Sequence, residues 1–564
     1  MKITYYGASG LVTGSSYLVE TTDYRLLIDC GMFQGSKTVK ELNYKDFPYD
    51  PSSIDAVILT HAHIDHSGLI PKLIKKGYSG PIYASPVTVK LCSIMLPDSG
   101  HIQEMEVERK NRKLRRADME LIEPIYNSDD ALNAIKHFKP TKYGTSIELS
   151  ETISFQLVNA GHILGSAQIV LSIKEGDTTK KVVFSGDLGS MNQPYVKDPK
   201  GVKDADIVIM ESTYGNRVHA DKSNRLDILA DVINSAQAKG GNIIIPAFAV
   251  ERTQDLLYYL QELQKDNKIP TLPIYIDSPL AIAATKIFRE NPENFDDETV
   301  ELIKEGNNPL TMENLRFSQT TEDSMKLNDI TQGAIIISAS GMADAGRIKH
   351  HLKHNLWRSN ATVIFVGYQA EGTLGRRLIE GCKEVTIHGE KIAVQASIEM
   401  FPGFSSHSDQ KELLNWVETT SKESAKIVLV HGEKDSLNTF ADLIEEQLRK
   451  ETLIPELGES IEFRGNDIIR TAPEKPWLEA IEEQQQVCPL PKQPDRKETQ
   501  KGFPIKKAGR EKRILLSEVN HSYTKVRKDL KLLVEKARKE RDYTLLLDTF
   551  EKISALLQET RKKS

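Results

Sequence analysis

Three histidines and an aspartate occur within six positions of the segment His-Ala-His-Ile-Asp-His-Ser-Gly, residues 61–68. The apolar run before the segment is typical of a buried strand, which places the cluster on a loop at a strand end. Alternate positions of such a segment point different ways, so one cation cannot bind all four side chains. We expect two neighbouring metals, one bound by His61 and His63 and the other by Asp65 and His66. Nitrogen and oxygen ligands without thiolate suit zinc, and the alternative is a histidine-rich surface turn.

Two further predicted strands end in metal-capable side chains. Residues 155–162 and 181–187 each pass from an apolar run through a small-residue turn to His162 and Asp187. A carboxylate has two oxygens and can bridge two cations a few Å apart, so Asp187 would complete a dinuclear site. Asp29 ends an earlier predicted strand. We expect it to orient a ligand histidine or the metal-bound water, the alternative being a turn cap.

Composition limits the class of protein. The chain has 564 residues, of which 39% are hydrophobic, and this length suggests roughly two to four domains. Four scattered cysteines argue against a disulfide framework and against a thiolate metal site. No apolar run approaches the roughly 18 residues of a membrane helix. The first residues are typical of a strand rather than a signal peptide, so we expect a cytoplasmic protein with no membrane segment.

Basic residues concentrate in two places. From Pro491 onward there are 21 Lys and Arg against 11 Asp and Glu, a net charge of +10, whereas residues 1–490 carry −16. Within this tail, apolar residues from Leu515 recur at helical spacing, which predicts a basic helical hairpin after a proline-containing linker. Such a tail attracts polyanions, and a solvated Lys-rich helix is the alternative. Residues 108–116 carry six basic side chains and have the same two explanations.

A pattern of strand, turn and helix recurs in the middle of the chain. Such alternation implies a parallel sheet. Ligands bind such sheets at the carboxyl ends of the strands. The apolar runs of this pattern are residues 242–246, 273–277, 334–338 and 362–367.

Two turns of this sheet are rich in small residues ahead of a helix, where free backbone N–H groups bind phosphate. Ordinary connections from strand to helix also use glycine, but two such turns in one domain favour phosphate binding. The predicted phosphate-binding residues are Ser338, Ser340, Gly341 and Arg347 in the first turn, and Gly372 and Arg376 in the second.

These motifs resemble the metallo-β-lactamase fold, an αββα sandwich whose metal site lies at the edge of two sheets. Three further segments are similar to signatures of the β-CASP family, the nucleic-acid-processing branch that includes ribonuclease J and the nuclease of messenger-RNA 3′-end formation. They are Val-Ile-Met-Glu-Ser-Thr-Tyr-Gly-Asn at 208–216, Pro-Gly-Phe-Ser-Ser-His-Ser-Asp at 402–409 and Val-Leu-Val-His-Gly-Glu at 428–433. The resemblance covers roughly residues 1–470, in order.

The resemblance implies an α/β protein in which a β-CASP domain with a parallel sheet, residues 209–388, is inserted into the sandwich. The sandwich then consists of residues 1–208 and 389–470. Residues 471–564 would form the linker and a helical, basic C-terminal extension. We expect this extension to contact RNA or another chain, and we also consider a homodimer.

Two Zn²⁺ ions and an RNA substrate follow from the same resemblance. The implied ligands are His61, His63 and His162 for one ion, Asp65, His66 and His431 for the other, and Asp187 as the bridge.

Catalysis is implied to use His407, steadied by Glu211, to protonate the leaving ribose 3′-oxygen. Asp65 and Asp29 are grouped with these catalytic residues. Endonuclease and also 5′-exonuclease action on RNA would leave 5′-phosphate and 3′-hydroxyl ends. His431 favours RNA, because DNA-repair members usually carry an apolar residue such as Val there. The alternatives are a hydrolase of a small thioester or lactam, a nuclease acting on DNA, and a catalytically silent scaffold.

Overall fold

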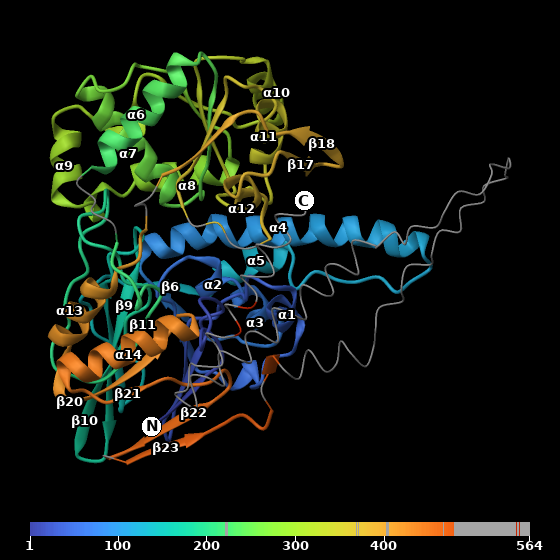
Figure 1. Ribbon diagram of the computed structural model, residues 1–564. Helices are drawn as coiled ribbons and strands as arrows, with labels where there is room; N and C mark the ends of the chain where they lie inside the picture. Colours follow the sequence, from blue (N-terminus) through green and yellow to red (C-terminus); the bar gives the residue numbers. More distant parts are fainter. Residues whose placement is uncertain are drawn as a thin grey trace. The chain divides into compact units, whose positions relative to one another are not determined.

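The chain divides into two compact units, Met1–Pro489 and Leu490–Ser564. Figure 1 shows the computed structural model. It describes residues 1–219, 224–367, 369, 372–401, 405–465, 467–475, 477–478, 549 and 552. The predicted basic helical extension therefore lies outside the described residues, apart from two positions. No helix in the described part of the chain is long and apolar enough to cross a membrane.

The first sheet has eight strands. Their order is β23 (Asp467–Thr471), β22 (Ser460–Arg464), β1 (Lys2–Tyr5), β2 (Tyr17–Glu20), β3 (Arg25–Ile28), β4 (Ala56–Ile58), β5 (Ile82–Ala84) and β6 (Phe138–Pro140). Neighbours from β3 to β6 pair in parallel, and the remaining neighbours pair antiparallel. Parallel strands are usually covered on both faces, which agrees with the fully buried Ala-Val-Ile of β4.

The second sheet has seven strands. Their order is β21 (Thr452–Leu453), β20 (Ser421–Val430), β11 (Ala205–Glu211), β10 (Thr178–Phe184), β9 (Ala167–Glu175), β8 (Ile153–Asn159) and β7 (Ile147–Glu148). The predicted strands that lead to His162, Asp187 and His431 correspond to β8, β10 and β20. All three strands belong to this one sheet, so their carboxyl ends carry side chains to the same edge.

Two sheets packed face to face form the core of the sandwich. Its buried side chains alternate along the strands, as expected for facing sheets, and include Ile3, Val19, Ile28 and Ile58 from the first sheet and Leu157, Ile169, Phe184, Ile209 and Val430 from the second. Helices cover the outer faces (Figure 1). They are α1 (Lys37–Glu41), α2 (Ile64–Ser67), α3 (Ile70–Lys75), α4 (Pro86–Arg116) and α5 (Ser128–Ile135) on the first sheet, and α13 (Gln410–Thr420) and α14 (Lys434–Leu448) on the second. The predicted αββα sandwich is confirmed.

The inserted domain is built on a six-stranded sheet. Its order is β14 (Leu315–Phe317), β13 (Ile274–Ile276), β15 (Ile335–Ser338), β12 (Ile243–Pro246), β16 (Thr362–Phe365) and β19 (Ser397–Met400). All neighbours pair in parallel, which confirms the predicted parallel sheet. The two edge strands were not predicted, because Leu-Arg-Phe and Ser-Ile-Glu-Met are too short and polar to stand out from loops.

Helices and a hairpin surround this sheet. The helices are α6 (Arg225–Ala238), α7 (Arg252–Lys265), α8 (Pro279–Arg289), α9 (Asp297–Lys304), α10 (Thr321–Lys326), α11 (Ile348–Asn355) and α12 (Leu374–Ile379). The hairpin joins β17 (Glu384–Ile387) to β18 (Glu390–Ala393). Short 3-10 turns occupy Leu42–Tyr44, Pro51–Ser53, Pro292–Asn294, Pro309–Thr311 and Leu327–Asp329.

Strand pairing locates where the chain passes between the sandwich and the insertion. β11 stays in the second sheet as far as Glu211, which pairs with Val430. β19 belongs to the inserted sheet, where Met400 pairs with Phe365. The pairing therefore favours crossings after Glu211 and after Met400 rather than at the predicted 208/209 and 388/389 boundaries.

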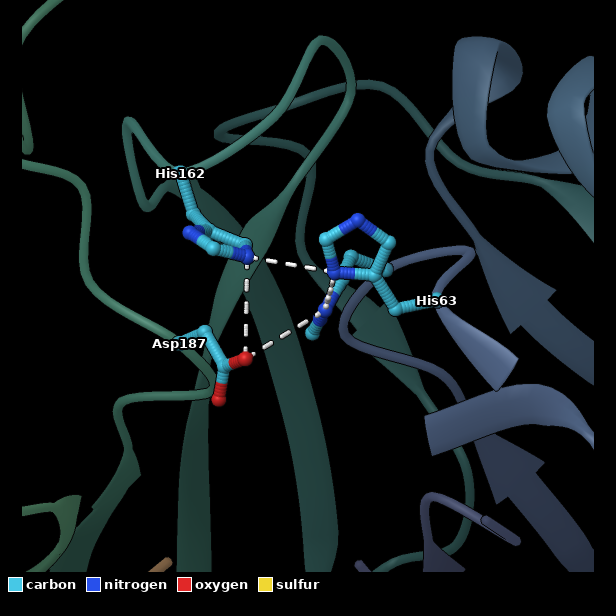
Figure 2. Close-up of side chains that lie close together, drawn as sticks. His63, His162 and Asp187 are labelled. Atoms are coloured by element: carbon cyan, nitrogen blue, oxygen red, sulfur yellow. Dashed lines mark hydrogen bonds and ion pairs between the residues drawn. The ribbon is translucent and has the colours of Figure 1, made fainter. Parts of the chain in front are cut away.

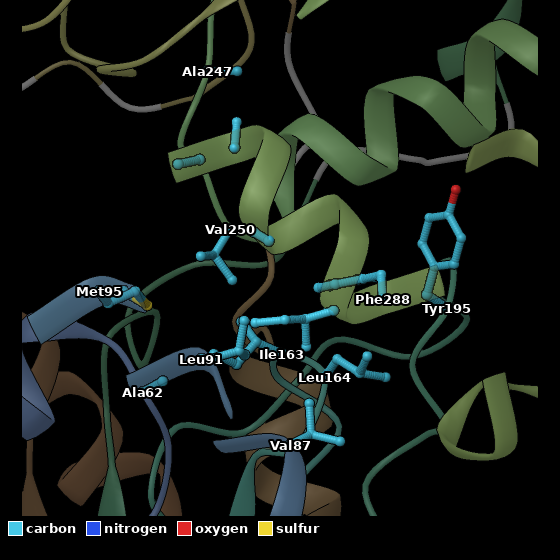
Figure 3. Packing of buried hydrophobic residues seen from close by; sticks show 14 of the residues in the cluster. Ala62, Val87, Leu91, Met95, Ile163, Leu164, Tyr195, Ala247, Val250 and Phe288 are labelled. Atoms are coloured by element: carbon cyan, nitrogen blue, oxygen red, sulfur yellow. The ribbon is translucent and has the colours of Figure 1, made fainter. Parts of the chain in front are cut away.

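Apolar packing holds the insertion against the sandwich. Figure 3 shows Leu91 and Met95 of α4 in one buried cluster with Val250 and Phe288 of the insertion. Tyr195 extends the cluster, and its ring contacts those of Tyr258, Phe288 and Phe295. Helix α4 therefore packs against the sandwich and also against the insertion.

Phe184 tests the core between the two sheets. Its side chain is 1% exposed, and its ring centroid lies 5.9 Å from that of Tyr17 on the first sheet. Phe184→Ala should lower the free energy of unfolding in urea by about 3–5 kcal/mol, because the buried ring leaves a cavity. Circular dichroism would measure the change. Met325→Ala, at a position 63% exposed, should change stability by less than about 0.5 kcal/mol. Equal effects of the two substitutions would contradict the core assignment.

Candidate metal centre

All seven predicted metal-binding side chains lie together at the edge of the sandwich. β4 leads directly to the first histidines, and α2 carries the next aspartate and histidine. The strands β8, β10 and β20 of the second sheet bring the remaining three. The described residues form three groups of suitable ligand atoms: His61, His63, His162 and Asp187; Asp65, His66 and His431; and Asp187, Glu211 and His407. The first two groups match the two ligand sets implied by the family resemblance.

Three imidazole nitrogens of the first group lie close together, and Figure 2 shows His162 joined to both His63 and Asp187. The Nδ1 atom of His63 lies 3.1 Å from His61 Nε2 and 3.2 Å from His162 Nε2. The Oδ2 atom of Asp187 lies 3.6 Å from the Nε2 atoms of both His61 and His162. Three nitrogens and one oxygen thus surround one point.

The second group shares Asp187 through its other oxygen. Asp187 Oδ1 lies 3.2 Å from His66 Nε2 and 3.7 Å from His431 Nδ1. His66 Nε2 and His431 Nε2 are 3.4 Å apart, and Asp65 Oδ2 lies 3.6 Å from His431 Nε2. Asp187 therefore stands between the two groups with one oxygen directed to each, as a bridging carboxylate would.

Burial and mutual repulsion keep most of these histidines neutral. Burial is the largest cause that lowers the pKa of His61 and His162, and it lowers the pKa of His63 to about 4. Burial also opposes charge on His66, but the carboxylates of Asp187 and Asp29 outweigh it and raise the pKa of His66. Neutral imidazoles have a free lone pair, which is the form that binds a metal.

The donor set fits a cation of the zinc type. The Oδ1 atom of Asp187 is buried without a hydrogen-bond partner among the described residues. A buried polar atom without a partner is costly, and a bound cation would supply that partner. Imidazole nitrogens with carboxylate oxygens are the ligands that zinc prefers. The arrangement is therefore a metal site.

Hydrogen bonds fix the orientation of the ligand histidines. The Nδ1 atom of His66 donates to Asp29 Oδ2 at 2.8 Å, which turns Nε2 toward the metal site. The backbone N–H and the hydroxyl of Thr60 donate to the same carboxylate, both at 2.8 Å. Thr213 Oγ1 lies 3.2 Å from His431 Nδ1. Carboxylate–histidine pairs of this kind orient the ring and increase its basicity as a ligand.

Backbone segments approach closely around the site. A Cβ atom at Gly31 would lie 1.7 Å from the carbonyl oxygen of Asp65, and one at Gly189 would lie 1.6 Å from that of Gly161. Only glycine fits these two positions. The ligand-bearing loops can therefore pack against one another without intervening side chains.

His407 lies beside the metal site and is paired with Glu211. Its Nδ1 atom is 3.0 and 3.1 Å from the two carboxylate oxygens of Glu211. Its Nε2 atom faces Asp187 Oδ2 at 4.0 Å. Burial opposes protonation of His407, but the Glu211 carboxylate outweighs it and raises the pKa of His407 to about 10. The imidazole therefore carries a proton at neutral pH.

Sequence reasoning missed the residues that support His407. The Nε2 atom of His219 lies 2.9 Å from the backbone carbonyl oxygen of His407. The ring of Tyr214 contacts the rings of both histidines. Tyr214 lies within the signature at 208–216, and His219 lies three residues after its end. This segment is therefore the part of the sequence from which both residues could have been identified. Ser15, whose hydroxyl is 3.3 Å from His66 Nε2, had no such signal.

The predicted phosphate-binding turn after β15 makes contacts within the fold. Ser338 is 1% exposed, and its hydroxyl donates to the backbone carbonyl of Asp277 at 2.7 Å. Arg347 Nη1 donates to the carboxylate of Asp277 at 2.7 Å and also to a backbone carbonyl. Gly341 packs beside Phe248. Through these contacts Ser338 and Arg347 stabilise the fold. Phosphate binding by this turn stays a prediction.

The second predicted turn also makes contacts within the fold. At the start of α12, the backbone N–H of Leu374 donates to the carboxylate of Asp344 at 2.9 Å. Arg376 pairs with Glu380 at 2.8 Å, and Gly372, with φ of +83°, forms the turn itself. A carboxylate already lies where a phosphate would bind, so the structure lends no support to Gly372 and Arg376 as phosphate ligands, and their role stays a prediction.

A groove of about 730 Å³ opens beside the metal site. It begins at His63 and follows one face of α4. Its other wall consists of loops at the carboxyl ends of β12, β13 and β15, and includes Phe248, Ser340 and Arg347. This is the edge at which parallel sheets bind ligands.

Comparison with known families agrees with this architecture. Residues 9–228 match the metallo-β-lactamase superfamily, residues 253–378 match the Beta-Casp domain, and residues 391–455 match the Zn-dependent metallo-hydrolase RNA specificity domain. The matches follow the order of sandwich, insertion and returning sandwich strands found in the structure.

Curated relatives match along most of the chain. Ribonuclease TTHA0252 of Thermus thermophilus is 36% identical over 79% of this chain and 96% of its own length. Transcription termination factor FttA of Methanocaldococcus jannaschii is 33% identical over 81% of this chain and 70% of its own length. FttA of Methanosarcina mazei is 32% identical over 80% and 70%. The chain therefore belongs to the β-CASP family of the metallo-β-lactamase superfamily.

Proposed function

We propose that this protein is a two-zinc ribonuclease that hydrolyses RNA phosphodiester bonds to leave 5′-phosphate and 3′-hydroxyl ends. The observation that carries the proposal is the meeting of the two ligand groups at Asp187, with the Glu211–His407 pair directly beside them. The matched RNA specificity domain and a relative named as a ribonuclease support RNA as the substrate. A cytoplasmic location and a homodimer remain predictions.

The residues of the two groups divide the metal-binding work. One ion would be held by His61, His63 and His162, the other by Asp65, His66 and His431, with Asp187 between them. When bound, such ions supply a water-derived nucleophile near neutral pH and neutralise charge on the phosphate.

Proton delivery belongs to His407. Because Nδ1–H donates to Glu211, the second ring proton sits on Nε2, which faces the metal site. Glu211 is itself fixed, since its Oε1 atom accepts from the backbone N–H of Leu188 at 2.6 Å. Departure of the ribose 3′-oxygen requires a proton, and the protonated His407 donates it from Nε2. The preference for RNA over DNA is inferred from the family resemblance, because His431 stands where DNA-repair members usually carry an apolar residue.

A small thioester or lactam substrate is not favoured. Such a substrate would need only the metal-binding residues. It would leave the long groove along α4 and the Glu211–His407 pair without a role. A catalytically silent scaffold is disfavoured by the complete ligand set.

Asp29 is proposed to orient His66, which predicts a specific loss in metal affinity. Asp29→Asn should weaken zinc binding by about 10- to 100-fold, because the ring of His66 loses the charged acceptor at Nδ1. Competition with a chromophoric chelator would measure the affinity. The control is Asp206→Asn, which changes an aspartate that pairs with Lys422 away from the site and should leave affinity unchanged. Equal affinities of the two variants would refute the orienting role.

His407→Ala separates proton donation from metal binding. The variant should keep about two zinc ions per chain by elemental analysis, while turnover falls by about 10²- to 10⁴-fold, the usual range for a general acid. His354→Ala, on α11 away from the site, is the matched control.

A substrate with sulfur in place of the bridging 3′-oxygen sharpens this test, because a thiolate leaves without a proton. The turnover deficit of His407→Ala should shrink by at least tenfold on that substrate. Loss of a metal from the variant, or an undiminished deficit on the sulfur substrate, would show that His407 has another role.

Matched single-stranded RNA and DNA oligonucleotides test the substrate class. Under one metal and salt condition, RNA should be cleaved substantially faster and yield 5′-phosphate ends. End analysis by labelling and electrophoresis distinguishes internal cuts from stepwise 5′ removal. Equal or faster cleavage of DNA would overturn the assignment to RNA.

A further inference from the structure

Helix α4 has a buried half and an exposed, basic end. It runs for 31 residues, and its last buried side chains are Val107 and Asn111. Figure 1 shows its carboxyl-terminal end extending past the sandwich helices. We call the exposed basic side chains of this end the basic ridge; they are Arg109, Lys110, Arg112, Lys113, Arg115 and Arg116. Residues 108–116 contain one acid, Glu108, and carry a net charge of +5.

The charges of the ridge are left largely unpaired by the fold. Arg112 pairs with Glu108 at 2.7 Å on the exposed surface. Among the described residues, the other five basic side chains of the ridge form no ion pair. Three acids follow, at Asp118, Glu120 and Glu123, and none pairs with the ridge. The positive charge therefore faces solvent.

Helix stability alone does not explain this pattern. Basic residues in the last turn interact favourably with the helix dipole, but the effect falls off within that turn. It accounts for Lys113, Arg115 and Arg116 and not for Arg109 to Arg112. Like charges three or four positions apart, such as Arg109 and Lys113, destabilise a helix by about 0.2–0.5 kcal/mol per pair. A role in binding a polyanion would explain why these like charges are present despite their cost in helix stability.

The ridge continues the groove that starts at the metal site. The groove lining along α4 includes Met95, Asp98, Ile102, Met105, Arg109 and Arg112, which share one helix face. At about 1.5 Å per residue, the path from Met95 to Arg112 is roughly 26 Å long. Such a length would hold on the order of four nucleotides of a single strand. A longer RNA leaving the groove along α4 would next meet the ridge.

We propose that the basic ridge binds the sugar-phosphate backbone of the RNA beyond the groove. This inference rests on the proposed ribonuclease function and extends it, because it makes affinity depend on substrate length. Lysine and arginine side chains on a helix contact phosphates without reading sequence. The other candidate partner is the acidic body of a second copy. Continuity with the groove favours RNA.

The test removes charge beyond the groove and leaves its lining intact. The ridge variant combines Lys110→Gln, Lys113→Gln, Arg115→Gln and Arg116→Gln. The control variant makes the same charge change elsewhere on the surface, with Lys304→Gln, Lys326→Gln, Arg289→Gln and Arg464→Gln. Circular dichroism should show both to be folded. Binding of fluorescent RNAs of 6 and 24 nucleotides is measured by anisotropy between 50 and 200 mM salt, and cleavage by KM and kcat.

The ridge variant should bind the 24-mer at least tenfold more weakly and raise its KM, with kcat within twofold of wild type. The slope of log affinity against log salt should fall by about 0.7 per lost phosphate contact, or roughly 2 to 3 for four residues. The 6-mer should change much less than the 24-mer, and the control variant should behave as wild type.

Several results would overturn the proposal. An unchanged salt slope, or equal losses on both RNAs, would remove the length-dependent contact. A shift in sedimentation that appears only in the ridge variant, without a loss of RNA affinity, would assign the ridge to contacts between copies. Failure of the wild type to cleave RNA would refute the proposed function separately, because binding and its salt slope are measured independently of cleavage.

Discussion

Buried imidazole nitrogens held 3.1 to 3.4 Å apart are the constraint on which this structure depends. Imidazole nitrogens at these distances need a shared proton or a shared cation between them, and burying polar atoms without partners is costly. The fold must supply the compensation, and it does so with rigid strand ends from two sheets. Asp29 and Thr60 fix His66, and Thr213 contacts His431. The hydrogen bonds at these strand ends therefore also orient the ligand side chains.

Much of the centre could be predicted because its ligands follow hydrophobic strands directly. His61, His162 and Asp187 each stand just past an apolar run, and the sheets bring those ends together as expected. The central parallel strands of the insertion were also visible as runs of Ile and Val. What could not be predicted depends on contacts between distant segments. The sequence predicts Arg347 as a phosphate ligand but does not reveal Asp277, 70 positions away, to which its guanidinium donates. No local pattern announces such a partner.

The insertion adds a wall to a site that the sandwich alone would leave open. Loops at the carboxyl ends of its strands face α4, and the two surfaces enclose the groove. Phe248, 47% exposed, is an aromatic side chain on the insertion side of this groove. Exposed aromatic rings are unfavourable in water but provide stacking surfaces for bases. The geometry thus combines a metal centre at one end, an exposed aromatic ring along the path and a basic ridge beyond it, an order suited to a long flexible polyanion.

Contacts with the sandwich hold the proposed proton donor beside the metal site. His407 follows the last strand of the inserted sheet, yet its partner Glu211 ends a strand of the sandwich. The carbonyl of the preceding Ser406 accepts from the backbone N–H of Ser190 at 2.9 Å and from the side chain of Gln193 at 2.7 Å, both in the sandwich. On the insertion side, burial and then the neighbouring Asp255 raise the pKa of Glu251 to about 8, so this carboxyl is protonated near neutral pH. A neutral Glu251 adds no second anion to compete with Glu211 for the imidazolium. The segment that carries His407 is therefore held by the sandwich, on the same side as the seven metal ligands.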